Sequence, residues 1–227
     1  MSGEAIAIIL LSAKVAFAAI LFALPIAFFV AWLLARYEFR GKSFLQALTT
    51  LPLVVPPVVT GYALLVLFGS KGAIGAFLND WFGITLAFRW TGAALAAGVM
   101  AFPLLVRPIR LSIETVDPGL EEAAATLGAS RLMTFLTVTL PLVLPGILAG
   151  TVLGFAKALG EFGATITFVS NIPGETQTLS LAVYSLLQSP SGDTEALRLI
   201  VASIVIAIVA VVASEWLAHR IRRRRAR

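Results

Sequence analysis

The side chains that could do chemistry are few in this sequence. It contains no cysteine and a single histidine, His219, which stands beside an arginine-rich C-terminus. Disulfides and thiolate metal sites are therefore excluded, and a histidine-based metal or acid–base centre is not indicated. We also find no GxxxxGK(S/T) phosphate-binding loop. We expect no catalytic residue, no cofactor site and no metal site in this chain.

The most informative carboxylates lie at the start of a short predicted helix. Asp117 can cap a helix whose first residue is Pro118, and Glu121 and Glu122 follow in its first turns. Carboxylates are stabilised there by the positive end of the helix macrodipole. The pattern therefore predicts a folded helix in this segment and not a loose loop.

The same segment continues into a second helix. Leu120 and Leu127 recur at helical spacing and give the first helix an apolar face. Gly128 can adopt the left-handed conformation that ends a helix, and Ser130 can cap a second helix that runs toward Pro141. We interpret the helix, the glycine bend and the second helix as a rigid lever.

The elements that hold this lever are predicted by composition. The chain of 227 residues is 59% hydrophobic and only 13% charged, with a mean hydropathy of +0.97. A soluble domain of this size does not have that balance, so the chain is predicted to be a polytopic membrane protein. The net charge of +5 comes from arginines near the C-terminus. We read it as a signal of membrane orientation and not as a nucleic-acid surface.

Apolar runs divide the chain into membrane segments of one all-α domain, residues 1–227. A crossing needs about 20 apolar residues, so we predict about five to six transmembrane helices. The predicted spans lie at about 5–35, 45–69, 90–112, 140–162 and 197–219. Segment 176–188 is short for a crossing and fits a re-entrant segment or a half-span, and segment 117–140 is the connecting loop that holds the lever.

Prolines interrupt the second predicted span. Pro52, Pro56 and Pro57 remove backbone donors and would break an ordinary helix. Within a bilayer, a broken backbone persists only where protein or a watery cavity covers it. We therefore name Pro56, Pro57, Thr60 and Gly61 as candidate residues of a passage or gate. A simple kink in a packed helix is the alternative.

An ionisable pair lies near the far end of the span at 140–162. Lys157 and Glu161 are one helical turn apart and could form an ion pair, and Gly163 follows closely. An ionisable residue at membrane depth is a functional candidate by default. We name Glu161 and Gly163 as further candidate residues of the passage, with a structural ion pair as the alternative.

Basic residues predict the orientation. With the N-terminus outside, most basic residues fall in the cytoplasmic loops and the tail: Arg36, Arg40, Lys42, Arg107, Arg110, Arg131 and the arginines of the C-terminus. The outer loops hold Lys71, Arg89 and Arg198. This positive-inside bias places segment 117–140 and the C-terminus in the cytoplasm.

The lever resembles a known loop signature. Its residues are Glu122-Ala123-Ala124, Gly128, Val138 and Leu140-Pro141. They are similar to the pattern EAA-x3-G-x9-I-x-LP of binding-protein-dependent ABC importer permeases, with valine at the isoleucine position. The stretches LPLVVPPVVTGYALLVLFG, GEFGATITFVSNIPGETQTLSLAVY and SEWLAHRIRRRRAR resemble the molybdate branch of this family.

This resemblance implies a fold, a function and a set of partners. The fold would be that of type I ABC importer permeases, in a bacterial or archaeal plasma membrane. The permease would be non-catalytic and form a homodimer with the passage at its interface. Its partners would be a cytoplasmic ATPase dimer that binds ATP-Mg and an extracytoplasmic protein that delivers molybdate or tungstate. The residues implied to couple to the ATPase are Glu121, Glu122, Ala123, Ala124, Leu127 and Gly128.

Alternative functions stay open at this point. A sulfate or thiosulfate permease belongs to the same class, since such permeases share a looser form of these segments. A stand-alone ion-coupled carrier would show inverted repeats, and none is convincing in this sequence. An intramembrane enzyme would need a catalytic constellation in the spans, and no cysteine, suitable histidine or aspartate pair is found there.

Overall fold

The computed structural model describes the backbone of residues 3–189 and 192–225, and the side chains of residues 3–189, 192–209 and 212. Every regular element within these residues is a helix. The predicted all-α class is therefore confirmed.

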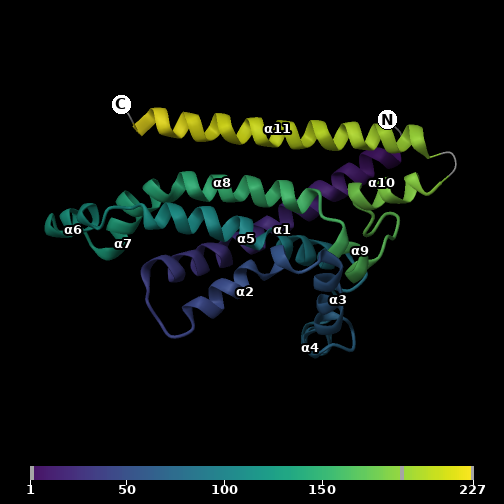
Figure 1. The fold of residues 1–227 in the computed structure, drawn as a ribbon, viewed down its shortest axis with the longest axis horizontal. Helices are drawn as coiled ribbons and strands as arrows, with labels where there is room; N and C mark the ends of the chain where they lie inside the picture. Colours follow the sequence, from purple (N-terminus) through teal and green to yellow (C-terminus); the bar gives the residue numbers. More distant parts are fainter. Residues whose placement is uncertain (1–2, 190–191, 226–227) are drawn as a thin grey trace.

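Four long helices lie along the long axis of the molecule. They are α1 (Gly3–Arg36), α5 (Trp90–Glu114), α8 (Leu140–Leu159) and α11 (Asp193–Arg225), and they run side by side in Figure 1. α5 packs against both α1 and α8, and α8 also contacts α11. The core of the molecule therefore lies along α5.

Small residues allow this close packing. Ala27 and Ala31 of α1 and Ala96 of α5 are fully buried. A Cβ atom added to Gly150 of α8 would lie 3.0 Å from the carbonyl oxygen of Leu105 on α5. Apolar burial gives little drive for association in lipid, so close packing of small residues is the expected way to hold helices together there.

Helices that could cross a membrane include three single stretches. Among the described residues, Gly3–Arg36, Trp90–Glu114 and Arg131–Leu159 are long and apolar enough. The third stretch, Arg131–Leu159, begins before residue 140, where the span was predicted to start. It begins earlier because the second helix of the connecting loop continues into this span without a break. The predicted span at 197–219 falls on α11, most of whose side chains from residue 210 onward lie outside the described part.

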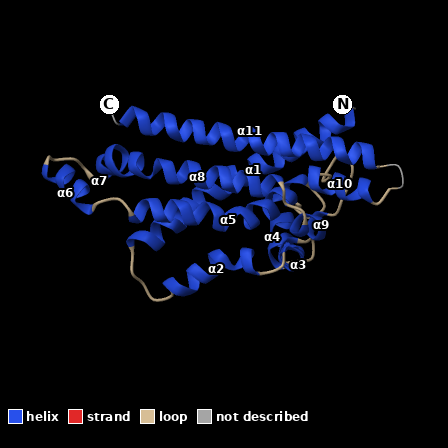
Figure 2. Ribbon diagram, turned by 45° about the horizontal axis from the view of Figure 1, so that its top comes forward, coloured by secondary structure: helices blue, strands red, loops and turns tan. Residues whose placement is uncertain are grey.

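The predicted span at 45–69 is two helices and not one. α2 (Lys42–Val54) and α3 (Pro57–Phe68) are bent by 115° and count as a fourth crossing only if taken together. The residue before a proline avoids helical geometry, and Val55 is accordingly extended, with ψ of 136°. α4 (Ala73–Phe82) follows, and α2 lies at the side of the bundle, where it contacts α5 (Figure 2).

Short elements cover the two ends of the bundle. At one end lie α6 (Pro118–Thr126), α7 (Arg131–Thr134) and the π-helix η1 (Phe135–Thr139). At the other end lie α9 (Gly163–Val169) and α10 (Leu179–Leu187) (Figure 1). We call these the α6 end and the α9 end.

The segment predicted as a half-span contains α10. This helix is too short to cross a bilayer. Its first residue, Leu179, donates its N–H to Ser12 Oγ of α1 at 2.7 Å, and Ser12 is 2% exposed. α10 is therefore held against α1 at the α9 end.

Candidate functional site

The first candidate site is α6, whose boundaries follow from local cap chemistry. Asp117 Oδ1 accepts a hydrogen bond from Gly119 N at 2.8 Å, as the predicted cap requires. Gly128 is left-handed with φ of +85°, and a Cβ added to it would meet nothing within 4 Å. Glycine is therefore favoured here by backbone conformation and not by lack of space.

The C-terminal cap of α6 completes the bend. Gly128 N donates to Ala125 O at 3.0 Å, and Ala129 N donates to Ala124 O at 3.1 Å. These two bonds are the Schellman pattern, which satisfies carbonyls that the helix leaves free. Ser130 Oγ then accepts from Met133 N at 3.3 Å and caps α7. The predicted succession of helix, glycine bend and helix is confirmed.

The second helix has a wider turn that the sequence did not predict. η1 is wound as a π-helix, and the N–H of Leu140 donates to the carbonyl of Phe135. Such turns are rare and often mark functional positions. This one joins the lever to α8.

The apolar face predicted for α6 is uncovered. None of the residues of α6 is buried. Leu120 is 48% exposed, and Leu127, at the turn that follows, is 89% exposed. Glu122 and Ala123 are also exposed, and α6 projects from the bundle in Figure 1. A projecting helix with exposed leucines is suited to binding another protein.

Glu121 differs from its neighbour Glu122 because it is bonded within the chain. Its Oε1 accepts from Arg36 Nη2 at 2.7 Å and from Thr139 Oγ1 at 2.5 Å. Arg36 ends α1 and Thr139 ends η1. The contacts of Arg36 and Thr139 with Glu121 were not predicted, since no local pattern links residues so far apart in the chain.

The second candidate site is the junction of α3 with α9. A Cβ on Gly61 would lie 2.5 Å from the carbonyl oxygen of Ala164, and a Cβ on Gly163 would lie 2.7 Å from Pro57 Cβ. Pro57 is the first residue of α3, and Pro56 is its N-cap. The structure therefore brings together Pro56, Pro57, Gly61 and Gly163, which were predicted from separate segments.

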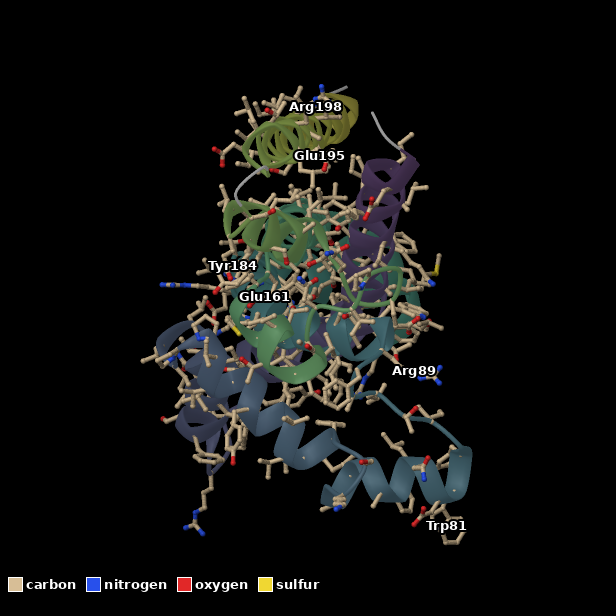
Figure 3. The ribbon with its side chains drawn as sticks, turned by 90° about the vertical axis from the view of Figure 1, so that its right-hand side faces the viewer. Trp81, Arg89, Glu161, Tyr184, Glu195 and Arg198 are labelled. Carbon is tan, nitrogen blue, oxygen red and sulfur yellow. The ribbon has the colours of Figure 1, made fainter. Side chains whose placement is uncertain are left out.

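Glu161, which follows α8, completes this junction. It is 2% exposed, its Oε2 accepts from Lys157 Nζ at 2.6 Å, and its Oε1 accepts from Ala164 N at 3.1 Å. The predicted pair with Lys157 is therefore confirmed. Figure 3 shows Glu161 inside the molecule near Tyr184, whose ring lies 4.9 Å from that of Phe162. Oε1 therefore holds the start of α9, and Oε2 ties Glu161 to α8.

Thr60 lies in a large groove between the bundle and the α2–α3 pair. The groove has a volume of about 1000 Å³, and its polar side chains include Thr49, Thr60 and Thr91. Most of its lining is aliphatic or aromatic. An oxyanion would lose hydration in such a groove and gain only a few hydroxyl donors, so this surface alone is poorly suited to bind one.

Metal ligands do not gather in the part of the chain that the structure describes. No group of three or more His, Cys, Asp or Glu side chains there is placed to hold a metal ion.

The chain is similar to known membrane transport proteins over most of its length. Residues 23–223 match the model of the family described as "Binding-protein-dependent transport system inner membrane component". The chain is 60% identical over 218 residues to the "Molybdenum transport system permease protein ModB" of Escherichia coli K12, which covers 96% of this chain and 95% of that protein. It is 39% identical over 180 residues to the "Sulfate transport system permease protein CysT" of Salmonella typhimurium, covering 78% and 65% of the two chains.

Solved structures share the fold at low sequence identity. A bacterial ABC transporter involved in the import of the acidic polysaccharide alginate superimposes with a TM-score of 0.74 at 19% identity, over 97% of this chain and 81% of that one. The MetNI methionine ABC transporter, in an inward-facing conformation, gives a TM-score of 0.73 at 16% identity, over 97% and 99%. The fold is that of ABC importer permeases.

Proposed function

The chain belongs to the family of binding-protein-dependent transport system inner membrane components, and from this premise we propose that it is the membrane permease of an ATP-driven molybdate or tungstate importer. The observation that carries the proposal is its 60% identity over 96% of its length to a molybdenum transport permease. The lower identity of 39% to a sulfate permease makes sulfate the second candidate substrate.

Its partners would follow from the same premise. We propose a homodimer, a cytoplasmic ATPase dimer that binds ATP-Mg, and an extracytoplasmic binding protein. The N-terminus would lie outside and the α6 end would lie in the cytoplasm. Support comes from the basic residues Arg36, Lys42, Arg110 and Arg131, which lie at or near the helix ends on that side.

ATP hydrolysis is assigned to the partner, because the chain has no phosphate-binding loop. α6 would dock on the ATPase through Glu122 and the exposed Leu120 and Leu127. Motion of the ATPase would displace α6, and the capped ends of that helix would transmit the displacement instead of absorbing it. A bistable bundle converts such a displacement into outward- and inward-facing states.

The passage would form between two copies of the chain. This assignment is supported by the groove of the single chain, whose apolar lining offers an oxyanion few donors. Hydroxyl and backbone groups near Thr60 and the α3–α9 junction would bind the ion weakly, and the delivering protein would select it. Substitution of Thr60 is therefore expected to alter the transport rate more than the oxyanion preference.

Uptake into vesicles tests the proposal. The chain is reconstituted with a defined molybdate-binding protein and ATPase, and uptake of molybdate is measured with and without ATP and with excess sulfate. We expect ATP-dependent uptake that sulfate does not compete with. Uptake without the ATPase would indicate a stand-alone carrier, and competition by sulfate would favour the sulfate-type alternative.

A variant of the exposed leucine tests the docking surface. Leu127→Asp places a charge at the centre of the proposed contact, and desolvating that charge would weaken assembly about tenfold or more. Co-purification with the ATPase measures this loss. Ile74→Asp on α4, an exposed apolar residue away from the α6 end, is the matched control and should leave assembly unchanged. Equal co-purification of both variants would remove α6 from the interface.

A further inference from the structure

A single carboxylate joins α6 to two other helices. Glu121 Oε1 lies 2.7 Å from Arg36 Nη2 and 2.5 Å from Thr139 Oγ1. The side chains of Arg36 and Glu121 are 21% and 26% exposed, so the pair is partly shielded from water. Shielding makes such a charge-assisted bond stronger and more directional than a surface pair.

Arg36 is itself held in place by aromatic contacts. Its guanidinium carbon lies 5.3 Å from the ring centre of Trp32 on α1. Trp32 meets Phe135 of η1 edge to face at 5.4 Å, and Phe28 meets Phe135 at 6.2 Å. Arg36 Nε is buried and makes no hydrogen bond within the described part of the chain. The aromatic side chains therefore position the guanidinium, and Glu121 is its anionic partner.

α6 lacks apolar anchors of comparable strength. None of its residues is buried, so no side chain of α6 belongs to the buried core, although α6 does contact η1 and α7. Without the Glu121 bonds, α6 would be held by its two connecting turns at Asp117 and Gly128 and by its contacts with η1 and α7. Those turns fix the direction of the chain but do not link α6 to α1.

We propose that Glu121 is the positioning residue that carries displacement of α6 into α1 through Arg36 and into α8 through Thr139. The inference rests on the function proposed above and adds a route within this chain. Glu122 would face the ATPase, while Glu121 would face the membrane helices. Two adjacent carboxylates would then have separate roles.

The amount of oxyanion taken up per ATP hydrolysed distinguishes these two roles. Glu121→Gln keeps the size and the acceptor oxygen of the side chain but removes the charge that pairs with Arg36. We expect co-purification with the ATPase and at least about half of the ATP hydrolysis to remain, while oxyanion uptake per ATP falls about tenfold, the factor expected for loss of a charge-assisted bond. The exchange of both charges, Arg36→Glu with Glu121→Arg, should restore most of the oxyanion uptake per ATP.

A distance measurement tests the link in the chain alone. The sequence has no cysteine, so Tyr37→Cys beside α1 and Ala125→Cys on α6 can carry spin labels without background. The label-to-label distance should be narrowly distributed when Glu121 is present and broadly distributed in the Glu121→Gln background. This readout does not require the ATPase.

Lys42→Met is the matched control, because it breaks the nearby pair of Lys42 with Glu38, whose side chain is 89% exposed, and should change neither readout. The inference would be overturned if Glu121→Gln changed neither the oxyanion uptake per ATP nor the distribution of distances between the two spin labels. Loss of co-purification in Glu121→Gln would also overturn it, since the carboxylate would then contact the ATPase. Failure of the proposed function gives a different result: the unaltered chain would not assemble with the ATPase, whereas the label distances would still respond to Glu121→Gln.

Discussion

Glu121 and Glu161 are two ion-paired carboxylates at opposite ends of the molecule, and they are used differently. Each accepts from a cationic side chain, at 2.7 Å from Arg36 and at 2.6 Å from Lys157. Lys157 is four residues from Glu161, whereas Arg36 is 85 residues from Glu121. The side chain of Glu161 is 2% exposed and that of Glu121 is 26% exposed. The pair at Glu161 therefore fixes one junction, and the pair at Glu121 links separate helices.

This difference has energetic consequences. Removing one partner of a buried pair leaves an uncompensated charge, which is costly, whereas a partly exposed carboxylate recovers hydration when its partner is lost. The α9 end should therefore respond to substitution mainly through stability. The α6 end should respond mainly through coupling, because its bonds contribute less to folding than to the position of α6.

Lys157→Met should have the largest effect on stability. It leaves the buried Glu161 carboxylate with only the N–H of Ala164, and the expected loss is about 3–5 kcal/mol. Unfolding of the purified chain in detergent measures it. Adding Glu161→Gln removes the stranded charge and should recover more than half of the loss. If the double variant is as unstable as the single one, the pair is not what holds this junction.

Gly61→Ala should have an intermediate effect. The new Cβ would meet the backbone of Ala164 at 2.5 Å, and a backbone cannot move aside as a flexible side chain can. We expect α3 to separate from α9 at a cost of about 1–3 kcal/mol, with assembly with the ATPase retained and uptake reduced. Gly3→Ala, where the added atom meets nothing within 4 Å, is the control. Equal stability of the two variants would mean that the junction is looser than described.

Thr139→Val should have the smallest effect on stability. It removes one of the two donors to Glu121 while keeping the shape of the side chain, for an expected loss of about 1 kcal/mol. Uptake per ATP should fall by less than in Glu121→Gln, because the bond to Arg36 remains. A loss of coupling as large as that of Glu121→Gln would show that the path through η1 dominates and that the path through Arg36 is minor.

Much of the lever could be predicted from sequence because its determinants are local. The caps at Asp117 and Ser130 and the left-handed Gly128 act within a few residues of the backbone that they satisfy. The pair of Lys157 with Glu161 is predictable for the same reason, since Glu161 lies only four residues after Lys157, just past the end of α8. The division of the second apolar segment was indicated by Pro56 and Pro57, although the prolines do not specify the 115° bend.

The remaining parts depend on tertiary packing. The sequence does not show that Gly61 meets Ala164 or that Glu121 meets Arg36, because each contact joins segments brought together only by the fold. Thr60 was predicted as a polar passage residue, and the structure places it in a mostly apolar groove. In the homodimer proposed above, a second copy would add further surfaces to this groove.

The wide turn of η1 has a consequence for how α8 can adjust. If those residues rewound as an ordinary α-helix, Leu140 N–H would pair with the carbonyl of Leu136 in place of Phe135. α8 would then rotate by about 100° and shift by about 1.5 Å along its axis relative to the lever, because one residue of helix couples the two movements. Rotation would drive bulkier side chains into Leu105, which Gly150 and Gly154 now approach closely. The π-helical turn therefore sets the rotation of α8 that places Gly150 and Gly154 against α5.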